Sequence, residues 1–134
     1  MVIRLKKQNT PEADDQKALV EWLRKYHPEI LFTCSPAGFK FPKPFSIIFA
    51  KVAAAMGYSK GTPDLTFYAA KNGYYGLCIE MKRPFIKGQP RGTQEPEQKI
   101  WQVKLAVGNY KYSMCEGFYE AQKCIEWYYG LRSA

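Results

Sequence analysis

The chain has 134 residues, of which 46% are apolar and 16% aromatic, so it can fold around one core and is not expected to be disordered. Its net charge of +8 favours a polyanionic partner, because lysine and arginine side chains near phosphates release condensed counterions. No apolar run approaches the roughly 20 residues that cross a bilayer, and residues 1–10 lack the apolar stretch of a signal peptide. We therefore expect a cytoplasmic protein with no membrane partner.

The first half of the chain predicts two helices and one strand. Thr10 and Pro11 supply a hydroxyl cap and a first-turn proline, and the helix should end near Tyr26, because His27 precedes a proline. A glycine, Gly57, ends the second helix. The expected elements are helices over 11–26 and 45–56, a strand over 30–34 and a proline-rich loop over 35–44.

The first predicted helix has an acidic residue on its apolar side. At about 100° per residue, Glu12 falls at the centre of the apolar arc, whereas Glu21 lies opposite. Glu12 is therefore predicted to point inward, although a first-turn carboxylate is also favoured by the helix dipole without any site role. The other residues of the arc are Gln16, Leu19, Val20, Trp22, Leu23 and Tyr26.

The second half predicts a β-hairpin followed by a helix, a strand and a helix. Asn72-Gly73 is a strong hairpin signal, because both residues tolerate positive φ. Pro96 and Gly108 mark the start and the end of the next helix. The expected elements are strands over 65–69, 75–81 and 110–114, helices over 96–107 and 118–129, and a loop over 83–94.

Two acidic residues and a lysine are predicted to converge at one edge of the sheet. Strand side chains alternate, so Glu80 and Lys82 project to the same face. Antiparallel pairing in the hairpin places Asp64, at the start of the first strand, beside the end of the second. Carboxylate oxygens are the ligands that Mg²⁺ prefers, and a nearby ammonium can stabilise charge on a phosphate. The structural alternative is a plain ion pair between Glu80 and Lys82.

Basic residues near these positions are the candidates for contacts with nucleic acid. Some belong to the aromatic loop 35–44 and others to the loop 83–94, which follows the Glu80 strand. The set comprises Lys40, Lys43, Lys60, Arg83, Lys87 and Arg91. The four scattered cysteines and the single histidine form no zinc pattern, so we expect reduced thiols in or near the core.

Three motifs together resemble the VRR-NUC branch of the PD-(D/E)XK nuclease superfamily. They are Gly61-x-Pro63-Asp64, Ile79-Glu80-x-Lys82 and Glu97-Gln98-x-x-Trp101, and the likeness extends to Glu12-x-x-x-Gln16. The resemblance covers nearly the whole chain. It implies an α/β fold with a restriction-endonuclease-like core, in which helices flank a mixed central sheet. Residues 1–134 would form a single nuclease domain, with residues 1–9 as a flexible basic N-terminus.

The resemblance also implies roles for particular residues. Asp64, Glu80 and the backbone carbonyl of Met81 would hold Mg²⁺, for which Mn²⁺ would substitute, and no small-molecule cofactor is expected. Lys82 would lie beside the attacking water. Glu12, acting through water, and Gln98 would lie close to the metal. Relatives usually carry Ser or Thr before the proline of this helix, where the chain has Glu95.

The small stand-alone members of this branch, many of them carried by phages, resemble Holliday-junction resolvases and act as homodimers. The residues and the resemblance therefore predict a homodimeric, metal-dependent endonuclease that hydrolyses branched DNA. Two alternatives remain open from sequence. The chain could be a nicking, flap or restriction-like nuclease on other DNA, or a non-catalytic nucleic-acid-binding module in which Glu80 and Lys82 form a structural pair.

Overall fold

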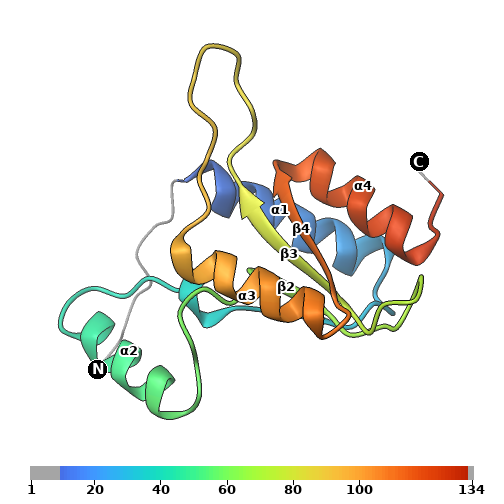
Figure 1. The fold of residues 1–134 in the computed structure, drawn as a ribbon. Helices are drawn as coiled ribbons and strands as arrows, with labels where there is room; N and C mark the ends of the chain where they lie inside the picture. The colour runs from blue at the N-terminus through green and yellow to red at the C-terminus, as the bar shows by residue number, and fades with distance from the viewer. Residues whose placement is uncertain (1–9, 133–134) are drawn as a thin grey trace.

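A computed structural model describes residues 10–132, and the predicted basic N-terminus at residues 1–9 lies outside the described residues. Its centre is a four-stranded sheet in which β1 and β2, and β2 and β3, pair antiparallel, whereas β3 and β4 pair parallel (Figure 1). The sheet is therefore mixed, as predicted. In order across the sheet, the strands are β1 (Phe32–Cys34), β2 (Leu65–Phe67), β3 (Leu77–Lys82) and β4 (Lys111–Glu116).

Helices cover both faces of the sheet. Leu19 and Leu23 of α1 (Pro11–Tyr26) and Ile125 of α4 (Phe118–Tyr129) belong to the buried core on one face. α3 (Pro96–Val107) connects β3 to β4 and lies over the opposite face (Figure 1). The parallel pairing of β3 and β4 requires such a crossover connection, and α3 supplies it.

The ends of the helices follow from local chemistry and agree with the predicted limits. The Thr10 hydroxyl accepts a hydrogen bond of 3.2 Å from the Ala13 N–H, which caps α1 as expected. One prediction on this helix is wrong: Tyr26 is 61% exposed, although spacing placed it on the buried arc. The helix buries only the stripe through Leu19 and Leu23, and Tyr26 in its last turn lies beyond that contact.

The hairpin is present, with strands shorter than predicted. Asn72 and Gly73 adopt φ values of 55° and 80°, the left-handed conformation that the turn requires. Continuous pairing runs only from Leu65↔Ile79 to Phe67↔Leu77, and the turn is closed farther out by an isolated bridge between Lys71 and Tyr74. The last three residues of β3 therefore extend past the start of β2.

Side chains of β3 alternate between two different environments, as predicted. Leu77, Ile79 and Met81 belong to the apolar core shared with α1 and α4. Glu80 and Lys82 point to the opposite face, beneath α3, where each contacts Gln98. Because burial of a charged group is costly without a partner, this second face must supply polar contacts.

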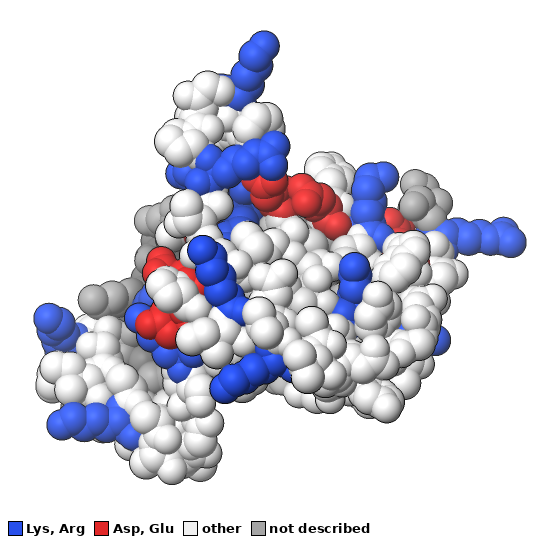
Figure 2. Space-filling view, in the orientation of Figure 1, with Lys and Arg blue, Asp and Glu red and all other residues white. Residues whose placement is uncertain are grey.

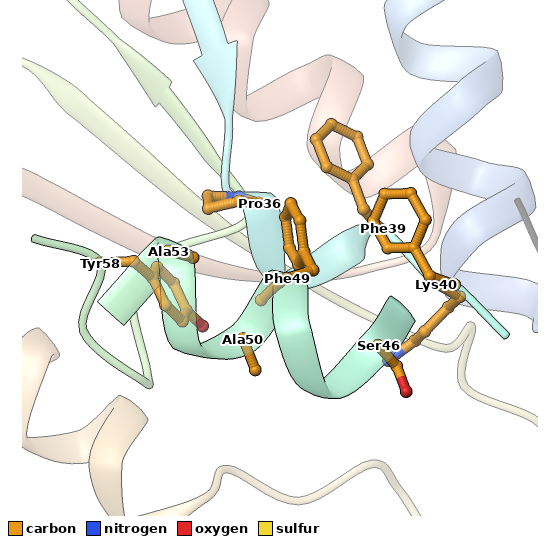
Figure 3. Close-up of a pocket in the computed structure, with 10 residues that line it drawn as sticks. Pro36, Phe39, Lys40, Ser46, Phe49, Ala50, Ala53 and Tyr58 are labelled. Atoms are coloured by element: carbon orange, nitrogen blue, oxygen red, sulfur yellow. The ribbon is translucent and has the colours of Figure 1, made fainter. Parts of the chain in front are cut away.

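The segment between β1 and β2 forms a separate apolar feature. It contains the short 3-10 helix η1 (Pro36–Gly38) and α2 (Phe45–Ala55), which projects away from the sheet (Figure 1). No residue of α2 is buried. A pocket of about 300 Å³ lies between the two helices, where the Phe49 ring meets Phe41 at 4.8 Å between centroids (Figure 3). Neither acidic residue of the predicted site lines this pocket.

All four cysteines are free thiols, in agreement with the expected reduced state, and two of them, Cys78 and Cys115, are buried. Among the residues that the structure describes, no helix has the length and apolar character needed to span a membrane.

Candidate functional site

Asp64 is held at the exposed end of the hairpin ladder. β2 begins opposite Ile79, so the Met81 N–H has no strand partner on that side and donates instead to Asp64 Oδ2, at 2.7 Å. The Asp64 backbone carbonyl accepts a hydrogen bond of 2.9 Å from the Ser35 N–H, which ties it to the end of β1. In an extended strand the N–H and C=O of one residue point to the same side, so the Met81 carbonyl also faces Asp64.

Gln98, in the first turn of α3, joins Glu80 to Lys82. Its Nε2 donates to Glu80 Oε1 at 2.5 Å, and its Oε1 accepts from Lys82 Nζ at 3.1 Å. The same Oε1 accepts the Glu95 N–H at 2.8 Å, which satisfies a free amide at the start of the helix. Within residues 10–132 there is no direct ion pair between Glu80 and Lys82, so the plain ion pair considered from sequence is not formed.

The two carboxylates perturb one another because both are removed from water. Glu80 is only 3% exposed, and its burial, followed by the negative charge of Asp64, raises its pKa to about 8, against the opposing charge of Lys82. Burial also raises the pKa of Asp64, against the opposing hydrogen bond from Met81. Burial therefore disfavours the state in which both carboxylates are ionised and no cation is bound.

One oxygen of this pair has no hydrogen-bond partner. Glu80 Oε2 is buried and unpaired within the described part of the chain. Such an atom requires a partner, and a divalent cation fits, because two carboxylates and the adjacent Met81 carbonyl are all hard oxygen donors. Lys82, itself only 8% exposed, is engaged by Gln98 and lies on the same face.

Glu12 belongs to the electrostatic surroundings of this group. Its negative charge is the smallest of the causes that raise the pKa of Asp64 and Glu80, and the prediction that it points toward the metal stays a prediction. Among residues 10–132, however, no three His, Cys, Asp or Glu side chains are grouped closely enough to hold a metal ion. A direct third carboxylate ligand is therefore absent from the described chain.

The glycine of the Gly-x-Pro-Asp motif permits close packing against α3. Gly61 has φ of +97°, and a Cβ placed there would lie 2.5 Å from the backbone carbon of Glu97. Next to it, the hydroxyls of Thr62 and Ser35 lie 3.0 Å apart. The loop that carries Asp64 is thereby fixed to the turn of α3 that carries Gln98.

Sequence reasoning missed two residues on the site face. Tyr112 of β4 pairs with Cys78, and burial raises its pKa to about 12, with smaller contributions from Glu80 and Asp64. Gln94 Nε2 donates to the Tyr112 hydroxyl at 3.4 Å and to Gln102 Oε1 at 2.8 Å. Only the parallel register places Tyr112 on this face, so the sequence pattern alone carried no signal for it.

The candidate nucleic-acid contacts do not form one patch. Lys40 and Lys43 lie in the segment that leads into α2, whereas Arg83, Lys87 and Arg91 belong to the projecting loop at the opposite end of the molecule (Figure 1). Lysine and arginine side chains are spread over the face in Figure 2, with acidic groups beneath the projecting loop. Two of the cations have acidic neighbours: Lys60 lies 3.7 Å from Glu97, and Arg91 lies 3.0 Å from Glu116.

Comparison with solved structures supports the fold predicted from the motifs. No protein-family model matches the chain, and no curated protein does so. A solved structure described as a "VRR_NUC domain protein" matches with a TM-score of 0.67 and 24% sequence identity, over 93% of this chain and 93% of that chain. The match shows that the chain has the fold of that VRR_NUC domain protein, as its motifs predict.

Proposed function

We propose that the chain is a Mg²⁺-dependent endodeoxyribonuclease that hydrolyses phosphodiester bonds in branched DNA, with four-way junctions as its main substrate. The observation that carries this proposal is the pair of acids, Asp64 and Glu80, which share one water-poor face with Lys82 and leave Glu80 Oε2 unpaired. The net charge of +8 supports a polyanionic substrate, and the VRR-NUC fold supports a nuclease-type domain.

Asp64, Glu80 and the Met81 carbonyl would hold the cation, with Glu12 near its outer side. Bound there, Mg²⁺ would lower the pKa of a water molecule and polarise the scissile phosphate. The chain's own residues prepare the geometry. The Met81 N–H fixes Asp64, Gln98 fixes Glu80, and the same amide oxygen steadies the Lys82 ammonium, which can then orient the attacking water or stabilise negative charge developing on the phosphate.

The test compares cleavage of a four-way junction, a flap and a linear duplex, with Mg²⁺, with Mn²⁺ and with EDTA. We expect junction cleavage only with a divalent cation, no cleavage by Asp64→Ala or Lys82→Ala, and retained DNA binding by both variants. Lys123→Ala, an exposed lysine on α4, is the control for loss of one positive charge. Preferred cutting of flap or linear DNA would revise the substrate, and binding without any hydrolysis would show a non-catalytic binding module.

We also propose that the active form is a homodimer, because one site per chain cannot make two symmetric cuts at a junction. α2 supports this assembly: Ile48, Val52 and Met56 follow one stripe of the helix and are 54%, 51% and 84% exposed. Sedimentation velocity should give a dimer for the parent protein and a monomer for Val52→Glu. A monomeric parent protein would contradict the proposal.

A further inference from the structure

The loop between β3 and α3, residues 83–94, projects from the sheet as a narrow arm (Figure 1). The arm contains three cationic residues, Arg83, Lys87 and Arg91, and no acidic residue. Its tip nevertheless carries large apolar side chains in water: Phe85 is 53% exposed and Ile86 is 51% exposed. Exposed apolar groups surrounded by one sign of charge indicate an interaction surface.

The arm is braced by two contacts within itself and by one contact to β4. The Arg83 guanidinium donates to the Pro90 carbonyl across the arm, and Arg91 Nη1 donates to Glu116 Oε1 at 3.0 Å. The Arg91 guanidinium also lies 4.3 Å from the centre of the Phe85 ring. These contacts hold the apolar tip out in one place, so that less conformational entropy is lost when it binds.

A tight turn displays the tip. The Gln89 N–H donates to the Ile86 carbonyl at 3.0 Å, and Gly88 adopts φ of +86°. The returning half of the arm passes beside the site, because a Cβ on Gly92 would lie 3.5 Å from Lys82 Cδ. A strand of nucleic acid that reaches Lys82 therefore also meets the base of the arm.

We propose that Phe85 and Ile86 form a wedge that inserts between bases where the stacking of DNA is interrupted, while Lys87 and Arg83 contact the flanking phosphates. Apolar side chains inserted at base steps are a common means of kinking DNA, and aromatic rings stack on bases of any sequence. The location beside the proposed phosphodiester site rests on the proposed function and favours DNA over an anionic membrane as the partner. The wedge would recognise the branch point, where stacking between neighbouring arms is interrupted.

The experiment uses a four-way junction with 2-aminopurine at the branch point, titrated with the full chain in EDTA, so that no cutting occurs. The parent protein should raise the fluorescence as the base unstacks. Phe85→Ala/Ile86→Ala should remove the increase and weaken binding roughly tenfold. Phe85→Leu should keep the increase, because a leucine side chain can still enter between the bases and separate them. Leu31→Ala, which changes a 73% exposed apolar side chain at the far edge of the sheet, is the matched control and should behave as the parent.

An undiminished fluorescence increase in the double variant would overturn the wedge, as would a parent protein that gives no increase. Binding of the arm to phosphatidylserine vesicles, with no DNA binding, would assign the tip to a membrane and overturn it as well. The readout is separate from cleavage. A fluorescence change without Mg²⁺-dependent cutting would reject the proposed nuclease activity and support the wedge. Cutting without a fluorescence change would support the nuclease activity and reject the wedge.

Discussion

The Nε2 atom of Gln98 lies 2.5 Å from Oε1 of Glu80, so the buried carboxylate is bound by a neutral amide rather than by the nearby ammonium. The arrangement leaves Glu80 without a paired cation, so the buried carboxyl, whose pKa is raised to about 8, holds its proton near neutral pH and would release it when a divalent cation binds. It also leaves Lys82, whose Nζ contacts only the other end of the same amide among the interactions of the described chain, available to a phosphate.

Replacement of Gln98 by Ala should reduce cleavage about 10- to 100-fold, because charge-assisted hydrogen bonds of this kind contribute about 1.5–3 kcal/mol. Single-turnover cleavage under saturating DNA would measure the loss in the chemical step. Ile100→Ala, at an exposed position of the same helix, is the control for changes in α3 itself. Parent-like cleavage by Gln98→Ala would show that Lys82 and Glu80 need no such support.

In the absence of divalent cations, the stability of the protein should fall as pH rises. Glu80 titrates near its ordinary value of 4.5 when unfolded but at about 8 when folded. Between these values only the folded state retains the proton, so each pH unit costs at most about 1.4 kcal/mol of unfolding free energy. Urea denaturation in EDTA at pH 5 and pH 8 should show a drop that is smaller in Glu80→Gln. Equal drops in the two proteins would contradict the assignment.

Gly61→Ala should destabilise the fold and impair cleavage together. A Cβ at Gly61 would lie 2.6 Å from the Glu97 carbonyl oxygen, so the loop of Asp64 and the first turn of α3 must separate. Gly73→Ala is the matched control, because its φ of +80° is equally unfavourable to alanine but no atom lies within 4 Å of the new Cβ. The control should lose about 1 kcal/mol of stability and keep its activity. Similar activities for the two variants would show that the Gly61 contact does not position the site.

The cations should contribute unequally to the salt dependence of DNA binding. Lys43 has no ion pair within residues 10–132, whereas Lys60 already lies 3.7 Å from Glu97. A free lysine that contacts phosphate should lower the slope of log Kd against log salt by about 0.9 when removed. We expect such a change for Lys43→Ala and a smaller one for Lys60→Ala, measured by fluorescence anisotropy. Identical slopes for the parent and Lys43→Ala would remove this residue from the interface.

Much of the fold was predictable because the ends of its helices and its hairpin turn are set by residues that are neighbours in the sequence. The Thr10-Pro11 start of α1, the Asn72-Gly73 turn and the Pro96 to Gly108 limits of α3 all depend on conformations that a few residues decide. The convergence of Asp64 with Glu80 also followed from the hairpin alone, since antiparallel pairing determines which ends meet.

Other features depended on contacts between distant parts of the chain. The resemblance implied that Gln98 lies close to the metal, but only the folded position of α3 over β3 shows that it joins Glu80 to Lys82. The exposure of Tyr26 and the place of Tyr112 on the site face depend on where packed elements end. The link from Arg91 to Glu116 likewise required the folded sheet.

None of the residues of α3, the helix that connects β3 to β4, is buried, yet this helix carries Gln98, whose side-chain amide joins Glu80 to Lys82. Segments with so little buried surface open locally at a small fraction of the global unfolding energy. A brief opening of α3 would hydrate Glu80 and Lys82 while the apolar core under β3 stayed intact, and its amides would exchange hydrogen sooner than those of the sheet. The arrangement of Glu80, Gln98 and Lys82 is thus expected to open more often than the sheet that supports it, and a ligand that contacts both α3 and β3 would hold it closed.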